Sequence, residues 1–283
     1  MPVTATHPTA ENLTFIRNFI RDESAINVQP GKEYLLESRL MPIVAEVGFR
    51  DMNQLGIALH EGVSSIVRQR VIEAMTTNET SFFRDEHPFK LLKSYLVPQV
   101  MKRRRSQRKL TIWSAACSSG QEPYSIAMVL RENFPELASW ETKIIATDLD
   151  RSILDKAVEG EYVQAEVDRG LSPALRERYF TRDGVCWKAG PELQSMIEFF
   201  PVNLIRCWPK FLADIDIVFV RNVLIYFTPK VKESILQRIA RVMHPDGYLM
   251  LGSSETTMNL DVPLIRESQG RSTYLQPVPK TVA

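Results

Sequence analysis

The stretch WSAACSSGQEP, residues 113–123, has the composition of a buried strand that turns into a helix. LTIWSAA at 110–116 is apolar enough to predict a strand, and EPYSIAMVLREN at 122–133 has helical spacing. The turn between them is rich in small residues and contains one glycine, Gly120, so a ligand can approach its backbone closely. Parallel sheets bind ligands at the carboxyl ends of their strands, which makes this turn the first candidate site.

Strand and helix patterns alternate after this stretch. Further strands are predicted at 143–150, 197–202, 215–220 and 247–255, and helices at 150–160 and 230–243. This alternation favours an α/β fold with a mostly parallel sheet and helices on both faces. A last strand near 272–276 follows a short loop and is expected to be antiparallel. The strand-like segments GVCWKAG and ELQSMIEFFPV predict a hairpin inserted before the third strand.

Residues 13–77 have helical apolar spacing, interrupted at Gly31, Gly48 and Gly62, which predicts a small all-helical domain. Pro88 suits the first position of the next helix, which ends in the basic run MKRRRSQRK at 101–109. The run could contact RNA or an acidic partner, although most such runs are solvated loop surface.

The composition excludes several classes of function. A formal net charge of +1 over 283 residues gives no global signal for nucleic acid or an anionic membrane. The three cysteines and four histidines lack the spacing of metal sites, so no metal is expected. The sequence shows no secretory signal and no apolar run of membrane-spanning length, so we expect a cytoplasmic protein without direct membrane insertion.

Two acids follow the first two strands of the predicted sheet. Glu122 opens the helix after the turn, where it would repel a phosphate and suit a ligand with a positive end. Asp148, at the tip of the next strand, is placed to accept hydrogen bonds from ribose hydroxyls. Together they fit a nucleoside that carries an ammonium group, as S-adenosylmethionine does. The alternatives are a helix-dipole role for Glu122 and an N-cap role for Asp148.

Polar residues also follow two other strands. Arg221 and Asn222 come directly after IDIVFV, with Tyr226 a few residues further on, and Asn203 and Leu204 follow IEFFPV. We therefore expect four strand ends to converge on one crevice. Alternatively, Tyr226 packs as a half-buried aromatic residue and Asn222 caps a turn.

The ordered motifs TTNETSFFRD, WSAACSSGQEPYSIA, ATDLD, FFPVNL, VFVRNVLIYF, HPDGYLMLGSSE and STYLQP resemble those of the CheR-type chemotaxis receptor glutamate O-methyltransferases. The resemblance covers about residues 13–276. It implies a class I S-adenosylmethionine-dependent methyltransferase with a Rossmann-like sheet. The implied organisation is an all-helical domain at 1–78, a linker and connecting helix at 79–109, and a methyltransferase domain at 110–283 with an inserted antiparallel β-subdomain at about 172–200.

The resemblance also implies the site residues. Arg84 and Tyr226 would be catalytic, beside the transferred methyl group; for Arg84, the alternative is an ion pair with Glu79, Asp85 or Glu86. The implied cofactor contacts are Asn78, Thr80, Arg84, Glu122, Asp148, Asn203, Leu204, Arg221 and Asn222.

The implied activity is methyl transfer from S-adenosylmethionine to side-chain carboxylates of specific glutamates on chemoreceptors, which gives methyl esters and S-adenosylhomocysteine for chemotactic adaptation. The implied partner is the cytoplasmic helical domain of the chemoreceptors in their arrays. Because TRDGVCWKAG turns over quickly, we expect no tether to a receptor pentapeptide. Arginines of the helical domain are expected to meet an acidic receptor face, or else to be ordinary surface: Arg17, Arg21, Arg39, Arg50, Arg68 and Arg70.

Two other functions stay open at this point. One is a methyltransferase for RNA or a small molecule, with the basic run as the RNA contact. The other is a catalytically idle S-adenosylmethionine sensor that binds chemotaxis partners. A dehydrogenase is disfavoured, because the chain has no GxGxxG motif.

Overall fold

The structure is a computed structural model that describes residues 8–29, 31–270 and 272–279. The chain forms two compact units. The first contains the chain up to Thr77 together with Tyr226–Val231, and the second contains Asn78–Ile225 and the chain from Lys232 onward. Within the described residues, no helix has both the length and the apolar character needed to cross a membrane.

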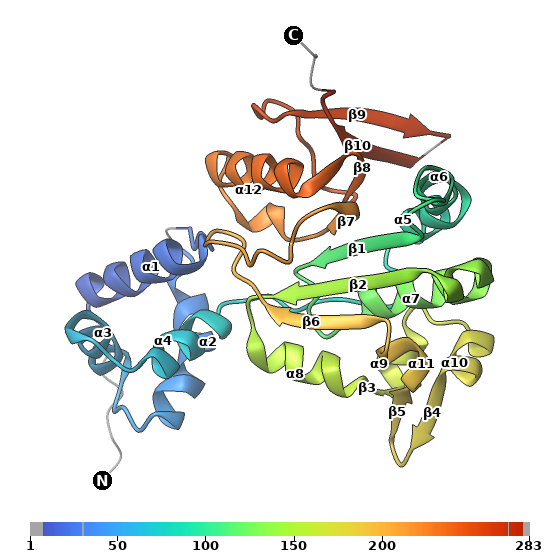
Figure 1. The fold of residues 1–283 in the computed structure, drawn as a ribbon. Helices are drawn as coiled ribbons and strands as arrows, with labels where there is room; N and C mark the ends of the chain where they lie inside the picture. The colour runs from blue at the N-terminus through green and yellow to red at the C-terminus, as the bar shows by residue number, and fades with distance from the viewer. Residues whose placement is uncertain (1–7, 30, 271, 280–283) are drawn as a thin grey trace. The chain divides into compact units, whose positions relative to one another are not determined.

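The first unit is helical, as predicted. Its core consists of apolar residues that recur every three or four positions, such as Ile16, Ile20, Leu36 and Leu40, all of which are fully buried. Side chains cap three of the helices: Thr9, Asp51 and Ser64 each accept a hydrogen bond from an amide of the first turn. The helices are α1 (Ala10–Ser24), α2 (Glu33–Glu46), α3 (Met52–Glu61) and α4 (Ser65–Glu73) (Figure 1).

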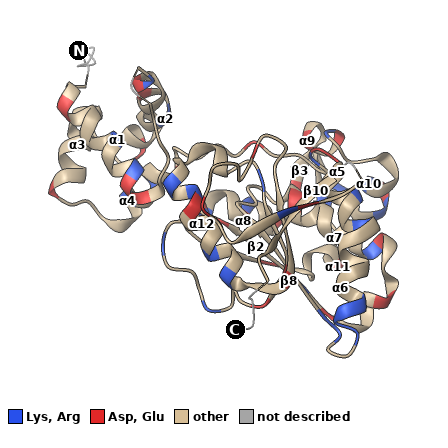
Figure 2. Ribbon diagram, turned by 90° about the horizontal axis from the view of Figure 1, so that it is seen from above, with Lys and Arg blue, Asp and Glu red and all other residues tan. Residues whose placement is uncertain are grey.

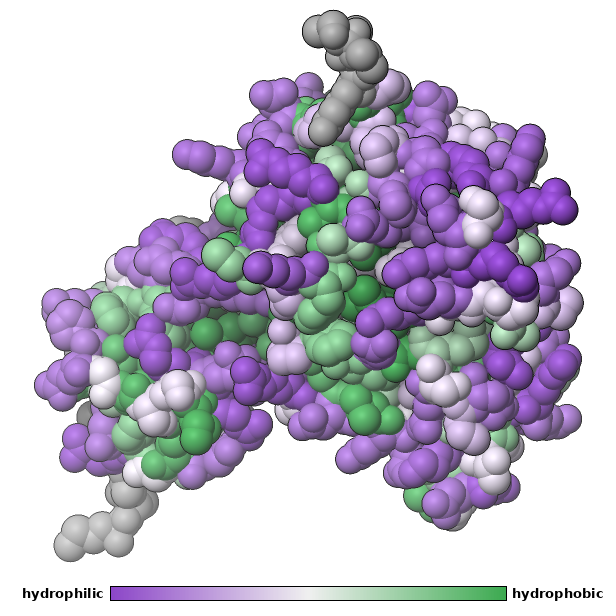
Figure 3. Space-filling view, viewed as in Figure 1, coloured by the Kyte–Doolittle hydropathy of each residue, from purple (hydrophilic) through white to green (hydrophobic). Residues whose placement is uncertain are grey.

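Each of the six arginines that were expected to face a receptor has a partner within the first unit. Arg39 donates to the carbonyls of Met75 and Thr76 at 2.8 and 2.7 Å. The other five form ion pairs: Arg17 with Glu33, Arg21 with Asp22, Arg50 with Asp51, Arg68 with Glu23, and Arg70 with Glu46. Positive and negative residues are accordingly interspersed on these helices (Figure 2), and apolar residues are scattered among the hydrophilic ones on the surface of this unit (Figure 3).

The second unit is built on a seven-stranded sheet with the order β6-β2-β1-β7-β8-β10-β9. The first five strands in this order are parallel, and β10 is antiparallel to β8 and β9, which confirms the predicted mostly parallel sheet with an antiparallel last strand. The strands are β1 (Lys109–Ala115), β2 (Glu141–Asp148), β6 (Ile197–Pro201), β7 (Ile215–Val220), β8 (Met243–Leu251), β9 (Leu264–Gln269) and β10 (Ser272–Pro277) (Figure 1).

Helices cover both faces of this sheet (Figure 1). The most buried is α7 (Gln121–Asn133), which packs between the sheet and the segments η1 and α11, so Tyr124 to Leu130 are all buried. The helices of this unit are α5 (His87–Leu91), η1 (Leu92–Leu96, a π-helix), α6 (Val97–Arg103), α7, η2 (Pro135–Ser139), α8 (Arg151–Glu159), α9 (Gln164–Asp168), α10 (Pro173–Tyr179) and α11 (Pro191–Gln194). After β7 come η3 (Leu224–Tyr226) and α12 (Pro229–Val242).

A separate three-stranded antiparallel sheet, of order β3-β5-β4, lies between α8 and β6 in the chain. Its strands are β3 (Glu161–Val163), β4 (Phe180–Asp183) and β5 (Cys186–Ala189). The predicted pairing of the inserted hairpin was therefore wrong. GVCWKAG pairs with the segment before it, residues 191–194 form α11 with Pro191 at its start, and Ile197–Pro201 is the parallel strand β6 beside β2.

The sequence analysis missed β9, because LIRESQ is polar and its residues after Leu264 are exposed. It is the edge strand next to β10, and only one of its sides pairs with a neighbour. An edge strand does not need an apolar face, so it gives little signal in the sequence.

Two arginines of the basic run 101–109 stabilise the fold. Arg104 donates to the buried carboxylate of Asp216 at 3.0 Å and to both oxygens of Asp246 at 2.5 and 3.1 Å. Asp216 also accepts the amide of Thr111 at 2.9 Å, and burial raises the pKa of this carboxyl group. Arg103 pairs with Asp246 at 3.4 Å and lies over the ring of Tyr248. These arginines join the amino-terminal ends of the strands to α6, which argues against an RNA contact through them.

We predict that Arg104→Gln lowers the free energy of unfolding by about 3 kcal/mol, because it leaves the buried Asp216 carboxylate without its cation. The measurement is urea denaturation followed by circular dichroism. Arg105→Gln is the matched control, since Arg105 is exposed and its loss is expected to cost less than about 0.5 kcal/mol. Equal stabilities of the two variants would contradict a structural role for Arg104.

Candidate active site

The turn after β1 has an unusual backbone. Ala116, Ser118 and Gly120 have φ values of 56°, 51° and 93°, so three alternate residues lie in the left-handed region. At a residue with a side chain this conformation costs roughly 1–2 kcal/mol, which neighbouring contacts must offset. A side chain at Gly120 would also come within 3.0 Å of the Cβ of Ala157 and 3.1 Å of the hydroxyl of Tyr162. Gly120, the only glycine of the turn, is therefore favoured both by its positive φ and by the lack of room for a side chain.

Asp148, the last residue of β2, holds this turn. One of its oxygens accepts the amide of Ser118 at 2.8 Å, and the other accepts the amide of Asp150 at 3.0 Å. Asp150, not Asp148, is the N-cap of α8, so the capping alternative for Asp148 was wrong. Burial raises the pKa of Asp148 from its ordinary value to about 6. A backbone hydrogen bond from Leu149 also acts on this carboxylate. An ionised carboxylate has about four lone-pair positions, so there is still room for a further donor.

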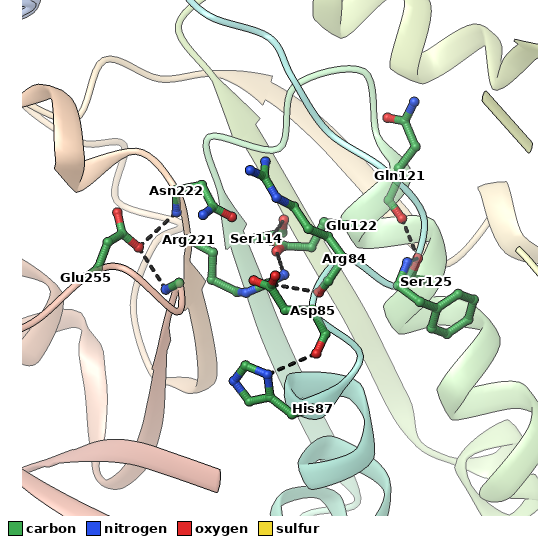
Figure 4. Close-up of polar contacts among 12 residues, drawn as sticks. Arg84, Asp85, His87, Ser114, Gln121, Glu122, Ser125, Arg221, Asn222 and Glu255 are labelled. Carbon is green, nitrogen blue, oxygen red and sulfur yellow. Dashed lines mark hydrogen bonds and ion pairs between the residues drawn. The ribbon is translucent and has the colours of Figure 1, made fainter. Parts of the chain in front are cut away.

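A buried guanidinium lies at the centre of the site (Figure 4). Arg221, directly after β7, has a side chain that is only 2% exposed. It donates to Glu122 at 2.8 Å, to Asp85 at 2.9 Å and to the carbonyl of Arg84 at 2.7 Å, while its Nε has no hydrogen-bond partner among the described residues. Ser114 donates to the other oxygen of Glu122 at 2.7 Å. Two carboxylates, those of Glu122 and Asp85, thus share the single guanidinium of Arg221.

Arg84 lies beside this cluster in Figure 4, and its guanidinium donates to the carbonyl of Glu79 at 2.8 Å. The three acids that could have paired with it have other cationic partners: Glu79 with Arg169, Asp85 with Arg221, and Glu86 with Lys90. Within the described residues, the Arg84 guanidinium therefore has a carbonyl partner and no ion pair, although its charge, after that of Arg169, lowers the pKa of Glu79.

The structure brings together the four strand ends that the sequence analysis selected, because β6, β2, β1 and β7 are neighbours with parallel directions. Asn203 follows β6 and accepts the amide of Ile205 at 3.0 Å, and Leu204 after it is buried. The chain order reverses between β1 and β7, which is where open α/β sheets bind ligands.

The remaining predicted residues lie before the sheet and after β7. Asn78 donates to Asp150 at 2.8 Å and accepts the hydroxyl of Ser118 at 2.9 Å, so the start of the second unit is tied to the turn. Thr80 is half-buried. Tyr226 ends η3, is 37% exposed and belongs to the first unit.

The sequence analysis missed Glu255. Its carboxylate accepts four backbone amides, those of Asn222, Val223 and Leu224 after β7 and that of Gly252 after β8, at 2.7–3.0 Å. Figure 4 shows the bond to Asn222. Asn222 is held with a φ of 59°. One side chain thus fixes the two loops to each other. The motif GSSE, residues 252–255, contains this acid, but only the fold shows that it reaches the loop after β7.

The sheet order and its antiparallel last strand are those of the class I S-adenosylmethionine-dependent methyltransferase fold, and comparison with known proteins identifies the family. Residues 78–269 match the family model described as CheR methyltransferase, SAM binding domain, and residues 11–76 match CheR methyltransferase, all-alpha domain. The chain belongs to the CheR methyltransferase family.

The similar proteins carry corresponding names. The chain is 41% identical to Chemotaxis protein methyltransferase 1 of Pseudomonas aeruginosa, over 89% of this chain and 93% of that protein. It is 40% identical to Chemotaxis protein methyltransferase Cher2 of Pseudomonas putida, over 88% and 92% of the two chains. A third, the Chemotaxis protein methyltransferase of Vibrio anguillarum, is 38% identical over 86% and 88%.

The residues at the strand ends fit S-adenosylmethionine chemically. Glu122 is a largely buried carboxylate that shares Arg221 with Asp85, and such an acid suits an ammonium group. Asp148 is a buried acceptor at the next strand end, which suits ribose hydroxyls. Small residues in the turn leave its backbone open to close approach.

We predict that Glu255→Gln lowers the free energy of unfolding by about 2 kcal/mol, because a carboxamide can accept only part of the four amide hydrogen bonds and its NH₂ group faces amide donors. We also expect a weaker affinity for S-adenosylhomocysteine, by roughly tenfold, since the loop with Arg221 and Asn222 is released. Denaturation and calorimetry measure the two effects. Glu267→Gln on β9 removes the same charge from an exposed position and is the control; a Glu255 variant that matches it would exclude the positioning role.

Proposed function

We propose that this protein transfers the methyl group of S-adenosylmethionine to side-chain carboxylates of specific chemoreceptor glutamates and forms glutamyl methyl esters. The observation that carries the proposal is the largely buried carboxylate of Glu122, which is held by Arg221 at the point where the sheet order reverses. Membership in the CheR methyltransferase family supports the same reaction.

We assign the cofactor to nine residues, of which Glu122 would bind the ammonium group and Asp148 the ribose. The full set is Asn78, Thr80, Arg84, Glu122, Asp148, Asn203, Leu204, Arg221 and Asn222. When bound, S-adenosylmethionine supplies an electrophilic methyl group on a sulfonium. Arg221 would keep the Glu122 carboxylate in place, and Ser114 would fix its second oxygen.

The reaction needs no strong base, because a glutamate side chain is already ionised near pH 7. The catalytic tasks are then to align the attacking carboxylate and to remove water from it. We assign the alignment to Arg84, whose guanidinium is bound to a neutral carbonyl and can still pair with an incoming carboxylate. Tyr226 would position the acceptor through its hydroxyl group.

The proposed partner is the cytoplasmic helical domain of chemoreceptors, in the receptor arrays. Esterification removes one negative charge from a helical bundle and so changes its packing. The first unit would meet an acidic receptor face, where receptor acids compete with the ion pairs that its arginines already form. The connection between β4 and β5 is only Gly184 and Val185, which supports a mode of binding without a pentapeptide tether.

The test of this function is incubation of the full-length protein with radiolabelled S-adenosylmethionine and chemoreceptor-containing membranes. We expect label on the receptors that mild alkali releases as methanol, since esters hydrolyse while methylated amines and bases do not. Arg84→Ala should lower the rate by at least about tenfold, through loss of a charge-assisted contact. Label that resists alkali, or that appears on RNA instead, would contradict the proposal.

The raised pKa of Asp148 gives a pH dependence to cofactor binding. The ionised carboxylate accepts hydroxyl donors better than the acid, so affinity for S-adenosylhomocysteine should fall as the pH decreases through about 6. We expect a loss of roughly tenfold between pH 7.5 and 5, the value of one charge-assisted hydrogen bond. Calorimetric titration measures it. The Asp148→Asn variant should bind S-adenosylhomocysteine weakly at every pH. If the affinity of the wild-type protein also did not change with pH, Asp148 would not be part of the ribose site.

A further inference from the structure

The second unit contains a cavity whose lining includes none of the residues assigned to the cofactor or to catalysis. Its volume is about 260 Å³, and it lies on the face of the sheet formed by β8, β10 and β9. Leu249, Leu275 and Arg266 are cross-strand partners in a row, so their side chains project to the same face. Leu249, Leu251 and Leu275 line the cavity, together with Arg266 on the exposed strand β9.

The polar side chains that line the cavity include one guanidinium and four hydroxyl groups, which can donate hydrogen bonds. Arg266 makes no hydrogen bond or ion pair with any residue that the structure describes, and hydroxyl groups line the same wall: Ser253, Thr256, Thr257 and Thr273. Glu255 is the only acid in the lining, and its two oxygens already accept four backbone amides. A cavity with a cation and several hydroxyls, but without an available carboxylate, is complementary to an anion.

The cavity borders the proposed transfer site on two sides. The ring of His87 forms one wall, and its Nδ1 lies 2.9 Å from the carbonyl of Asp85, whose carboxylate pairs with Arg221 (Figure 4). Glu255 forms another wall and holds Asn222 by its amide at 2.8 Å. The cavity therefore shares His87 and Glu255 with the segments that hold Arg221 and Asn222.

We propose that this cavity binds a second acidic side chain of the acceptor protein, near the glutamate that is methylated, with Arg266 as its ion-pair partner. The inference rests on the proposed function. A volume of about 260 Å³ suits an aspartate or glutamate side chain, and is below the ~300–1,000 Å³ of sites for drug-sized ligands. The leucines would contact the methylene groups, and the hydroxyls and Arg266 would bind the carboxylate. Arg266 would thus determine which glutamates are chosen, and would take no part in the transfer.

The test compares Arg266→Gln with wild type in steady-state methylation of chemoreceptor-containing membranes. We expect kcat/KM for the receptor to fall by about tenfold through KM, the value of one charge-assisted ion pair, with kcat and the affinity for S-adenosylhomocysteine unchanged. Arg266→Lys should recover part of the loss. Arg105→Gln removes the same charge after α6 and should match wild type.

A second measurement uses receptors in which the acids flanking the methylated glutamate are changed to glutamine. These receptors should be poorer substrates for wild type but not for Arg266→Gln, because the two changes remove the same contact. Equal losses in both enzymes, or an Arg266→Gln variant within twofold of wild type, would overturn the inference. If wild type itself forms no alkali-labile ester, the proposed function fails instead.

Discussion

The site depends on one buried ion pair, between Arg221 at the end of β7 and Glu122 at the start of α7. Their side chains are 2% and 12% exposed, and a charge that is so far removed from water is costly unless its partners are in place. Asp85 and the carbonyl of Arg84 complete the environment of the guanidinium. Through these contacts Arg221 joins three segments that are far apart in the chain. Any arrangement that separates them leaves its buried charge without partners.

Backbone amides fix the surroundings of this pair. Asp148 accepts amides from the turn after β1 and from the loop after β2, and Glu255 does the same for the loops after β7 and β8. A carboxylate that accepts several amides holds its loop in one conformation, even where single residues have left-handed φ values. The ends of β1, β2, β7 and β8 are thus preorganised by two acids, which explains how a site with few glycines can keep a fixed backbone conformation.

The sequence predicts the parts of this fold that repeat a local pattern. The strand 215–220 agrees with β7 because five of its six positions are apolar and all six are buried, as in a central parallel strand. The inserted hairpin was paired wrongly, since short segments such as 192–202 have similar patterns whether they end in a helix or a strand. Strand β9 could not be predicted from the sequence, because its residues are polar and exposed. The role of Glu255 could not be predicted either, because it binds amides of residues more than 30 positions away. Arg104 in the basic run looked like solvated surface for the same reason: its partner Asp216 lies 112 positions away.

The exposed edge strand β9 limits the ways in which the protein can recognise a polypeptide substrate. It ends the sheet with Arg266 and Glu267 at its centre, and charged residues at such a position discourage a second chain from extending the sheet. This edge therefore disfavours pairing with an extended polypeptide. An α-helical substrate has already satisfied its own main-chain groups, so it offers only side chains, and recognition by pockets and charges suits it better than recognition by strand addition.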